Sequence, residues 1–223
     1  MDVIQTIVRF FQEGGPFMFP ISIVLALGVA VALERYVFLS TAKRTNKNAF
    51  AQLEPLLASS RFEQILEIGK SSSAPIARVI AAGVARLSIS PRREDIEYAM
   101  EEGLMESIPR LEKRTDYLGT LANISTLLGL LGTIIGLIAA FSAVANADPA
   151  EKASLLSQSI SVAMNTTAFG LIAAIPLLAF HSVLQTKTTE IIDSMEMAGV
   201  KCLNTLVASN NIRPQTRVSD IRE

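Results

Sequence analysis

The chain has 223 residues, of which 50% are hydrophobic and only 18% are charged, and its mean hydropathy is positive, at +0.39. In soluble domains about a quarter of the residues are charged, so the low charged fraction of this chain indicates a membrane protein. The formal net charge of −1 leaves no global field that would attract a polyanion, which excludes nucleic-acid binding as the function. One cysteine and one histidine cannot supply a Cys/His metal site, so we expect neither a metal nor another cofactor.

Residues 1–15 form the first predicted segment. Apolar residues recur there at three- and four-residue spacing between polar ones, which is typical of an amphipathic helix on a membrane surface. An extension of the next helix outside the membrane is the alternative. No basic region precedes the first apolar block, so we expect the segment to be retained and not cleaved as a signal peptide. Gly14, Gly15 and Pro16 then mark a break.

Residues 16–39 are predicted to form the first transmembrane helix. The run from Phe17 to Leu33 is uncharged, and with its flanks it provides about the 20 residues that cross a bilayer at about 1.5 Å each. Basic residues follow at once, and the positive-inside rule therefore places this end in the cytoplasm. These residues are Lys43, Arg44 and Lys47.

Residues 40–115 are too polar for lipid and too apolar to be disordered, and we expect a cytoplasmic helical region. Residues 71–75 form a serine-rich linker that ends in a helix-starting proline. Ser90 and Pro91 predict another helix start, with Ser90 as the N-cap. Beyond Pro91 only Pro109 should bend the chain, so one helix is predicted to run from the cytoplasm into the membrane.

The second transmembrane helix is predicted at residues 116–145 and the third at residues 159–185, with a polar periplasmic loop at residues 146–158. Basic residues crowd the start of the second helix, so it should enter from the cytoplasm. The N-terminus is then periplasmic, and residues 186–223 form a cytoplasmic C-terminal helix and tail. The predicted fold class is an all-α membrane protein with three transmembrane helices and long helices extending into the cytoplasm.

The second transmembrane helix contains glycines and hydroxyl groups that a simple anchor does not need. Gly132 and Gly136 form a small-x-x-x-small pattern that allows close helix packing, and Gly129 lies on a neighbouring face. Thr126 and Thr133 are seven residues apart and therefore share a face. Each hydroxyl either lines a functional path or bonds to the carbonyl four residues earlier, and the sequence leaves both possibilities open.

The third transmembrane helix contains Asn165, Thr166 and Thr167, followed by Gly170. An amide and two hydroxyls are costly to desolvate, so they must contact protein or water and not lipid. Hydrogen bonding between helices and a polar track both remain open. Pro176 is expected to kink this helix.

Neither the second nor the third span contains an Asp, Glu, Lys or Arg at depth. A self-contained proton pump or ion exchanger should carry an ionisable group inside the membrane. We therefore expect the titrating carboxylate to come from another subunit.

Two runs of sequence carry a family resemblance. The first is residues 127–133, Leu-Leu-Gly-Leu-Leu-Gly-Thr, followed by Gly136 and Phe141. The second is residues 165–176, Asn-Thr-Thr-Ala-Phe-Gly-Leu-Ile-Ala-Ala-Ile-Pro. Together they resemble the ExbB/TolQ/MotA family of ion-driven motor stators, and the three spans are closest to its ExbB/TolQ branch.

The resemblance implies a homopentamer in the bacterial inner membrane around a dimer of a single-span ExbD/TolR/MotB-like subunit, whose membrane Asp binds the ion. Ion flow would drive rotation or mechanical work on the cell envelope, with a TonB-like or other envelope effector as a further partner and no enzymatic step. Positions matching Thr133 and Thr167 line the ion path in such proteins. The further path candidates are Thr126, Asn165 and Thr166, and the predicted packing residues are Gly129, Gly132, Gly136, Gly170 and Pro176.

Two positions depart from the family pattern. Val162 stands where many relatives carry Glu, and Thr126 stands where many carry Pro. The missing Glu weakens a proton relay by this chain, and the extra hydroxyl would suit Na⁺ as the alternative ion, although the family favours protons. Two other functions stay open: a structural scaffold without ion flux, and a self-contained ion transporter.

Overall fold

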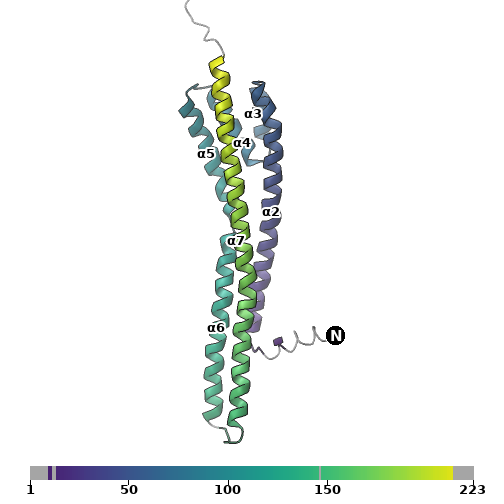
Figure 1. Cartoon of the computed structure of the whole chain (residues 1–223), viewed down its shortest axis with the longest axis vertical. Helices are drawn as coiled ribbons and strands as arrows, with labels where there is room; N and C mark the ends of the chain where they lie inside the picture. The colour runs from purple at the N-terminus through teal and green to yellow at the C-terminus, as the bar shows by residue number, and fades with distance from the viewer. Residues whose placement is uncertain (1–9, 12–13, 146, 213–223) are drawn as a thin grey trace, which may run out of the picture. The chain divides into compact units, whose positions relative to one another are not determined.

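The structure of the chain is a computed structural model that describes residues 10–11, 14–145 and 147–212. Its described part contains helices and no strands (Figure 1), so the predicted all-α fold class is confirmed. The helices are α2 (Met18–Ala58), α3 (Phe62–Ser71), α4 (Pro75–Leu87), α5 (Arg93–Glu112), α6 (Asp116–Ala145) and α7 (Lys152–Ile212). The amphipathic helix predicted at residues 1–15 falls mostly outside the described residues.

Three stretches are long and apolar enough to cross a membrane: α2, the stretch from Arg93 to Ala145 that includes α6, and α7. This confirms the three predicted transmembrane helices. α6 has the same bounds as the second predicted span. α2 and α7 continue far beyond the predicted ends of their spans, without a break at residue 39 or residue 185. The change from apolar to charged sequence there marks the end of the apolar stretch and not the end of a helix.

The prediction of one uninterrupted helix from Pro91 into the membrane is wrong. Pro109 lies inside α5, and the chain turns only after Glu112, where Arg114 adopts a left-handed conformation with φ of 70°. The amide of Lys113 donates to the carbonyl oxygen of Pro109 at 3.0 Å and closes the last turn of α5. The helix therefore ends where one residue enters the left-handed region, which leaves no strong signal in a sequence when that residue is not glycine.

The helix starts in the charged region were predicted with mixed success. α4 begins at Pro75, as predicted, because proline loses nothing at a first-turn position whose amide has no partner within the helix. α5 begins at Arg93, and the predicted N-cap Ser90 does not cap it. The Ser90 hydroxyl instead donates to a carboxylate oxygen of Asp95 at 2.5 Å.

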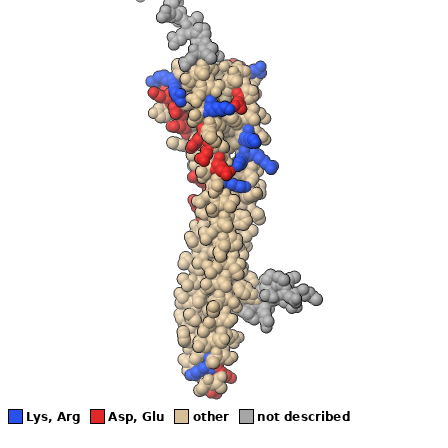
Figure 2. All heavy atoms as spheres, viewed as in Figure 1, with Lys and Arg blue, Asp and Glu red and all other residues tan. Residues whose placement is uncertain are grey.

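The chain divides into two compact units: unit 1 contains residues 1–36 and 114–185, and unit 2 contains residues 37–113 and 186–223. In unit 1, buried Met18, Ile21, Phe169 and Ala173 form a cluster. The surface of its helices is apolar, and Figure 2 shows no acidic or basic side chain on the visible face along the middle of this unit. Large exposed side chains such as Phe141, at 65%, suit lipid or neighbouring subunits.

In unit 2, α4 packs against both α3 and α5, and α7 lines a groove together with α4 and α5. Asn46 of α2 is buried and connects three helices. Its side-chain oxygen accepts from the amide of Ile76 at 3.2 Å, and its side-chain nitrogen donates to the sulfur of Met195 at 3.4 Å. The first contact satisfies an amide in the first turn of α4, which has no partner within its own helix.

Candidate functional site

Two threonine hydroxyls meet between α6 and α7. The hydroxyl oxygens of Thr133 and Thr167 are in hydrogen-bond contact. Both hydroxyls also lie within donor distance of the carbonyl oxygen of Gly129, at 3.1 Å for Thr133 and 2.9 Å for Thr167. Thr133 thus makes the local bond to the carbonyl four residues earlier and also a contact with the other helix. The structure brings together the two residues to which the family resemblance assigns the ion path.

Glycines allow this contact because they bring the two backbones close together. A β-carbon built on Gly129 would lie 3.2 Å from the Cα of Thr167. One built on Gly170 would lie 2.8 Å from the carbonyl oxygen of Ser125 and 3.0 Å from the Cα of Gly129. Backbone atoms cannot move aside as a flexible side chain can, so a larger residue at either position would separate the helices.

The remaining predicted packing glycines also face α7. A β-carbon on Gly132 would overlap the methyl group of Thr166, and one on Gly136 would lie 2.9 Å from the Cβ of Ala163. Pro176 lies inside α7, which the structure assigns as one helix throughout.

Thr166 has a different environment from Thr167. It is 2% exposed, and its hydroxyl lies 2.7 Å from the carbonyl oxygen of Gly14 and 2.9 Å from that of Val162. Gly14 precedes α2, and the next residue, Gly15, has φ of 71°, a conformation that favours glycine. Thr166 therefore ties the chain just before the first span to the third span.

Thr126 and Asn165 lie apart from the threonine pair. Thr126 is exposed, and its hydroxyl donates to the carbonyl oxygen of Ala122 at 3.2 Å, the local bond that the sequence left open. Asn165 is half-buried one turn or less from Thr167 on α7. Among the described residues, neither Thr126 nor Asn165 forms a hydrogen bond with Thr133 or Thr167.

Ser125 is a polar residue near the site that the sequence analysis missed. It is fully buried, and its hydroxyl oxygen has no hydrogen-bond partner among the described residues. Ser125, Gly129 and Gly132 are spaced by four and three residues, so they share the face of α6 that packs on α7. That spacing with two glycines was the signal in the sequence.

An ion pair and a histidine–carboxylate contact connect the spans at the end of unit 1 where α6 begins. The guanidinium of Arg114 lies 3.7 Å from the carboxylate of Glu34 on α2. The imidazole of His181 on α7 lies 3.5 Å from the carboxylate of Asp116 on α6. These pairs stand at the end that the positive-inside rule places in the cytoplasm, where charged side chains anchor helices at a membrane surface.

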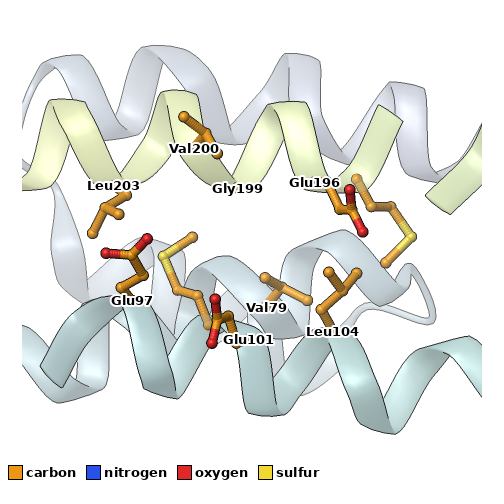
Figure 3. A pocket seen from close by; sticks show the side chains of 10 residues that line it. Val79, Glu97, Glu101, Leu104, Glu196, Gly199, Val200 and Leu203 are labelled. Carbon is orange, nitrogen blue, oxygen red and sulfur yellow. The ribbon is translucent and has the colours of Figure 1, made fainter. Parts of the chain in front are cut away.

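Unit 2 contains an apolar groove of about 340 Å³ between α5 and α7, with Val79 of α4 at its base. Figure 3 shows the carboxylates of Glu97, Glu101 and Glu196 around the space between these helices. Among the residues that the structure describes, no group of His, Cys, Asp and Glu could hold a metal ion, so these carboxylates do not form a metal site.

Comparison with known proteins identifies the family. A model of the MotA/TolQ/ExbB proton channel family matches residues 71–197, more than half of the chain. An ExbB homolog of Methanothermobacter thermautotrophicus, described as a biopolymer transport protein, is 29% identical over 196 residues, which cover 86% of this chain and 67% of that protein. Biopolymer transport protein exbB1 of Vibrio cholerae is 30% identical over 182 residues, with coverage of 78% and 77%. Tol-Pal system protein TolQ of Haemophilus influenzae is 34% identical over 93 residues, with coverage of 42% and 40%.

The family match includes all of α6 and the part of α7 that carries Thr167. The three apolar helices are those expected of an inner-membrane protein. The name of the family describes a channel and not an enzymatic reaction. The chain therefore belongs to the MotA/TolQ/ExbB proton channel family, as a stator-type membrane subunit of an ion-driven envelope system.

Proposed function

We propose that this chain forms part of an ion path along α6 and α7 and converts ion flow into rotation or mechanical work on the cell envelope. The observation that supports this most directly is the contact of Thr133 with Thr167 beside the carbonyl oxygen of Gly129. Three oxygen atoms from two helices converge at this point within apolar sequence.

The chemistry of the pair suits transfer of a cation. Each hydroxyl has one proton to donate and two lone pairs that accept. When one threonine donates to the other and the second donates to the Gly129 carbonyl, each hydroxyl oxygen keeps a free lone pair for a water molecule, a hydronium ion or Na⁺. The pair adds no fixed charge, so it can assist passage without holding a cation tightly.

The titrating group would come from a partner. Residues 117–145 and 153–186 contain no Asp, Glu, Lys or Arg. We propose that a dimer of a single-span ExbD/TolR/MotB-like subunit supplies the ion-binding Asp and that a homopentamer of this chain surrounds it, with its N-terminus in the periplasm and its C-terminus in the cytoplasm. A TonB-like or other envelope effector would receive the work.

Protons are the favoured ion, with Na⁺ as the alternative. The matching family is described as a proton channel family. Val162 replaces the Glu of many relatives, so proton transfer would rest on water held by the threonines and on the partner Asp. Asn165 and exposed Thr126 would extend the path, whereas Thr166 would mainly hold the start of α2 in place.

The test replaces each path hydroxyl by a methyl group of similar size. Thr133→Val and Thr167→Val, each purified with the partner and reconstituted in liposomes, should lower ion flux about tenfold or more, a change of about 1.4 kcal/mol in barrier height. Thr167→Ser keeps the hydroxyl and should retain most flux. Thr120→Val is the matched control, because the exposed Thr120 hydroxyl donates to the carbonyl oxygen of Asp116 and to no other residue in the described part of the chain.

Assembly is measured on the same samples by size-exclusion chromatography. Full flux in both valine variants would refute the assigned path. An intact wild-type complex that carries no ions under a gradient would favour the scaffold function. Flux through the purified chain without a partner would favour a self-contained transporter.

A further inference from the structure

A second cavity in unit 2, of about 240 Å³, lies beside the part of α2 that follows the apolar stretch. Its walls come from α2, from the linker before α4, and from α4 and α5. None of the residues proposed for the ion path lines it. A function of this cavity is therefore separate from the proposed ion path.

The cavity presents two arginines and one glutamate. Arg78 of α4 and Arg110 of α5 line it together with Glu106 of α5. None of the three forms an ion pair with any residue that the structure describes. The cavity therefore carries a net charge of +1 that the described part of the chain does not neutralise. Arginine also has the planar set of donors that matches phosphate oxygens.

Hydroxyl groups line the same cavity. Thr41 and Thr45 are four residues apart on α2 and therefore share a face of that helix. Ser73, in the linker just before α4, also lines the cavity. The side chains of these three residues form no hydrogen bond with another described residue. Two guanidinium groups and three hydroxyls are thus available to donate hydrogen bonds to one anion.

The location along the chain indicates which anion would be present. Phe38 and Thr41 stand on either side of the predicted end of the first span, and both line the cavity. Phe38 is 40% exposed, and Leu111 adds a second apolar side chain to the lining. In the proposed orientation, on which this inference rests, phospholipid headgroups of the cytoplasmic leaflet lie at this depth, and basic pockets on this side of a membrane are suited to acidic lipids.

We propose that this cavity binds the phosphate group of an acidic phospholipid headgroup. Arg78 and Arg110 would contact the phosphate, and Thr41, Thr45 and Ser73 would donate to its free oxygens or to the headgroup. A phosphodiester carries one negative charge, which balances the net charge of the cavity. Phe38 and Leu111 would contact the adjoining glycerol and the first carbons of the acyl chains.

The experiment uses the full-length chain in a neutral detergent and measures its melting temperature with added lipid. Phosphatidylglycerol should raise the melting temperature of the wild type, because a ligand that binds only the folded state stabilises it. Phosphatidylcholine and inorganic phosphate at the same concentration should have little effect. Equal stabilisation by inorganic phosphate would overturn the assignment to a lipid.

Paired variants test the site itself. Arg78→Gln combined with Arg110→Gln should weaken the apparent affinity for phosphatidylglycerol about tenfold or more. Arg61→Gln combined with Arg93→Gln is the control, because it removes the same charge from exposed positions outside the cavity. Both double variants replace exposed residues, and circular dichroism checks that each variant folds. An equal loss of affinity in the two doubles would reduce the effect to net charge and refute the site.

A substitution of Glu106 should change the affinity for phosphatidylglycerol in the opposite direction to the arginine substitutions. Glu106→Gln should strengthen binding of phosphatidylglycerol, since it removes a negative charge beside the phosphate. Glu102→Gln, on the same helix and outside this cavity, should leave binding unchanged. Weaker binding in Glu106→Gln, with a preference for phosphatidylethanolamine in the wild type, would instead show recognition of an ammonium group and would overturn the proposal.

Discussion

The hydroxyl groups of Thr133 and Thr167 lie in contact although 34 residues separate them in the chain. The contact exists because Gly129 and Gly170 let the backbones of α6 and α7 approach closely at the adjoining turn. Close packing and the polar pair are thus one arrangement: a change that separates the helices would also separate the hydroxyls. The stability of this contact can be tested apart from ion flux.

Two glycines of the same helix should respond in opposite ways to alanine. Gly170→Ala should destabilise the protein by about 1–3 kcal/mol, because its new methyl group would meet the backbone of α6. Gly199→Ala should stabilise it by about 0.5–1 kcal/mol, because a β-carbon there lies 3.8 Å from the terminal carbon of Met100 and alanine favours the helix. Thermal unfolding of the full chain measures both, and the same sign for both variants would contradict the packing described here.

Thr166 should act on stability through the contact with Gly14. Thr166→Val leaves the buried carbonyl oxygen of Gly14 without this donor and should cost about 1–3 kcal/mol. Thr166→Ser keeps the hydroxyl and should recover most of that loss. Unfolding measurements should show the difference, and limited proteolysis near residue 14 should be faster in the valine variant. Unchanged stability in Thr166→Val would show that this hydrogen bond contributes little.

Cys202 should be unreactive in the folded protein. It is 1% exposed, and burial, with a smaller contribution from the nearby carboxylate of Glu54, raises the pKa of its thiol to about 12. At pH 8 only about one thiol in ten thousand would be a thiolate, the form that reacts. Mass spectrometry should find no maleimide adduct on the native chain at pH 8 and full labelling after denaturation.

An exposed cysteine supplies the control for that experiment. Cys202→Ala combined with Ala208→Cys moves the thiol to an exposed position on the same helix, where it should be labelled rapidly in the folded protein. Labelling of native Cys202 as fast as this control would contradict its burial.

The start of α5 should loosen in acid. The hydrogen bond from Ser90, followed by smaller effects of Arg92, lowers the pKa of Asp95. A carboxylate with a lowered pKa stabilises the folded state above its unfolded pKa of about 3.9, and that contribution is lost as the pH falls through the folded pKa. Hydrogen exchange at the first turn of α5 should therefore speed up, relative to its intrinsic rate, below about pH 4.

Ser90→Ala removes the main cause of this shift. The pKa of Asp95 should rise toward its unfolded value, so exchange at this turn should already be faster at neutral pH and should speed up less in acid than in the wild type. Ser88→Ala is the control, because the Ser88 hydroxyl donates to the carbonyl oxygen of Val84 and not to Asp95. Identical acid profiles for Ser90→Ala and the wild type would show that the Ser90 bond does not control Asp95.

The sequence by itself determined the helical class, the three apolar helices, the bounds of α6 and the start of α4 at Pro75. These features follow from local properties: hydropathy adds along the chain, and proline restricts its own backbone whatever lies nearby. The two runs that carry the family resemblance, residues 127–133 and 165–176, could also be recognised from the sequence, because they depend only on the order of residues.

The tertiary structure alone decided which polar groups meet. Thr166 and Thr167 are adjacent in sequence, yet one bonds to Gly14 and the other contacts Thr133. The difference depends on how α7 is rotated against its neighbours, and packing at Gly129 and Gly170 sets that rotation. Arg114 likewise ends the helix before α6 through a left-handed conformation that its residue type does not predict. Neither result could be read from the sequence, because each depends on contacts between residues far apart in the chain or on a backbone conformation imposed by the fold.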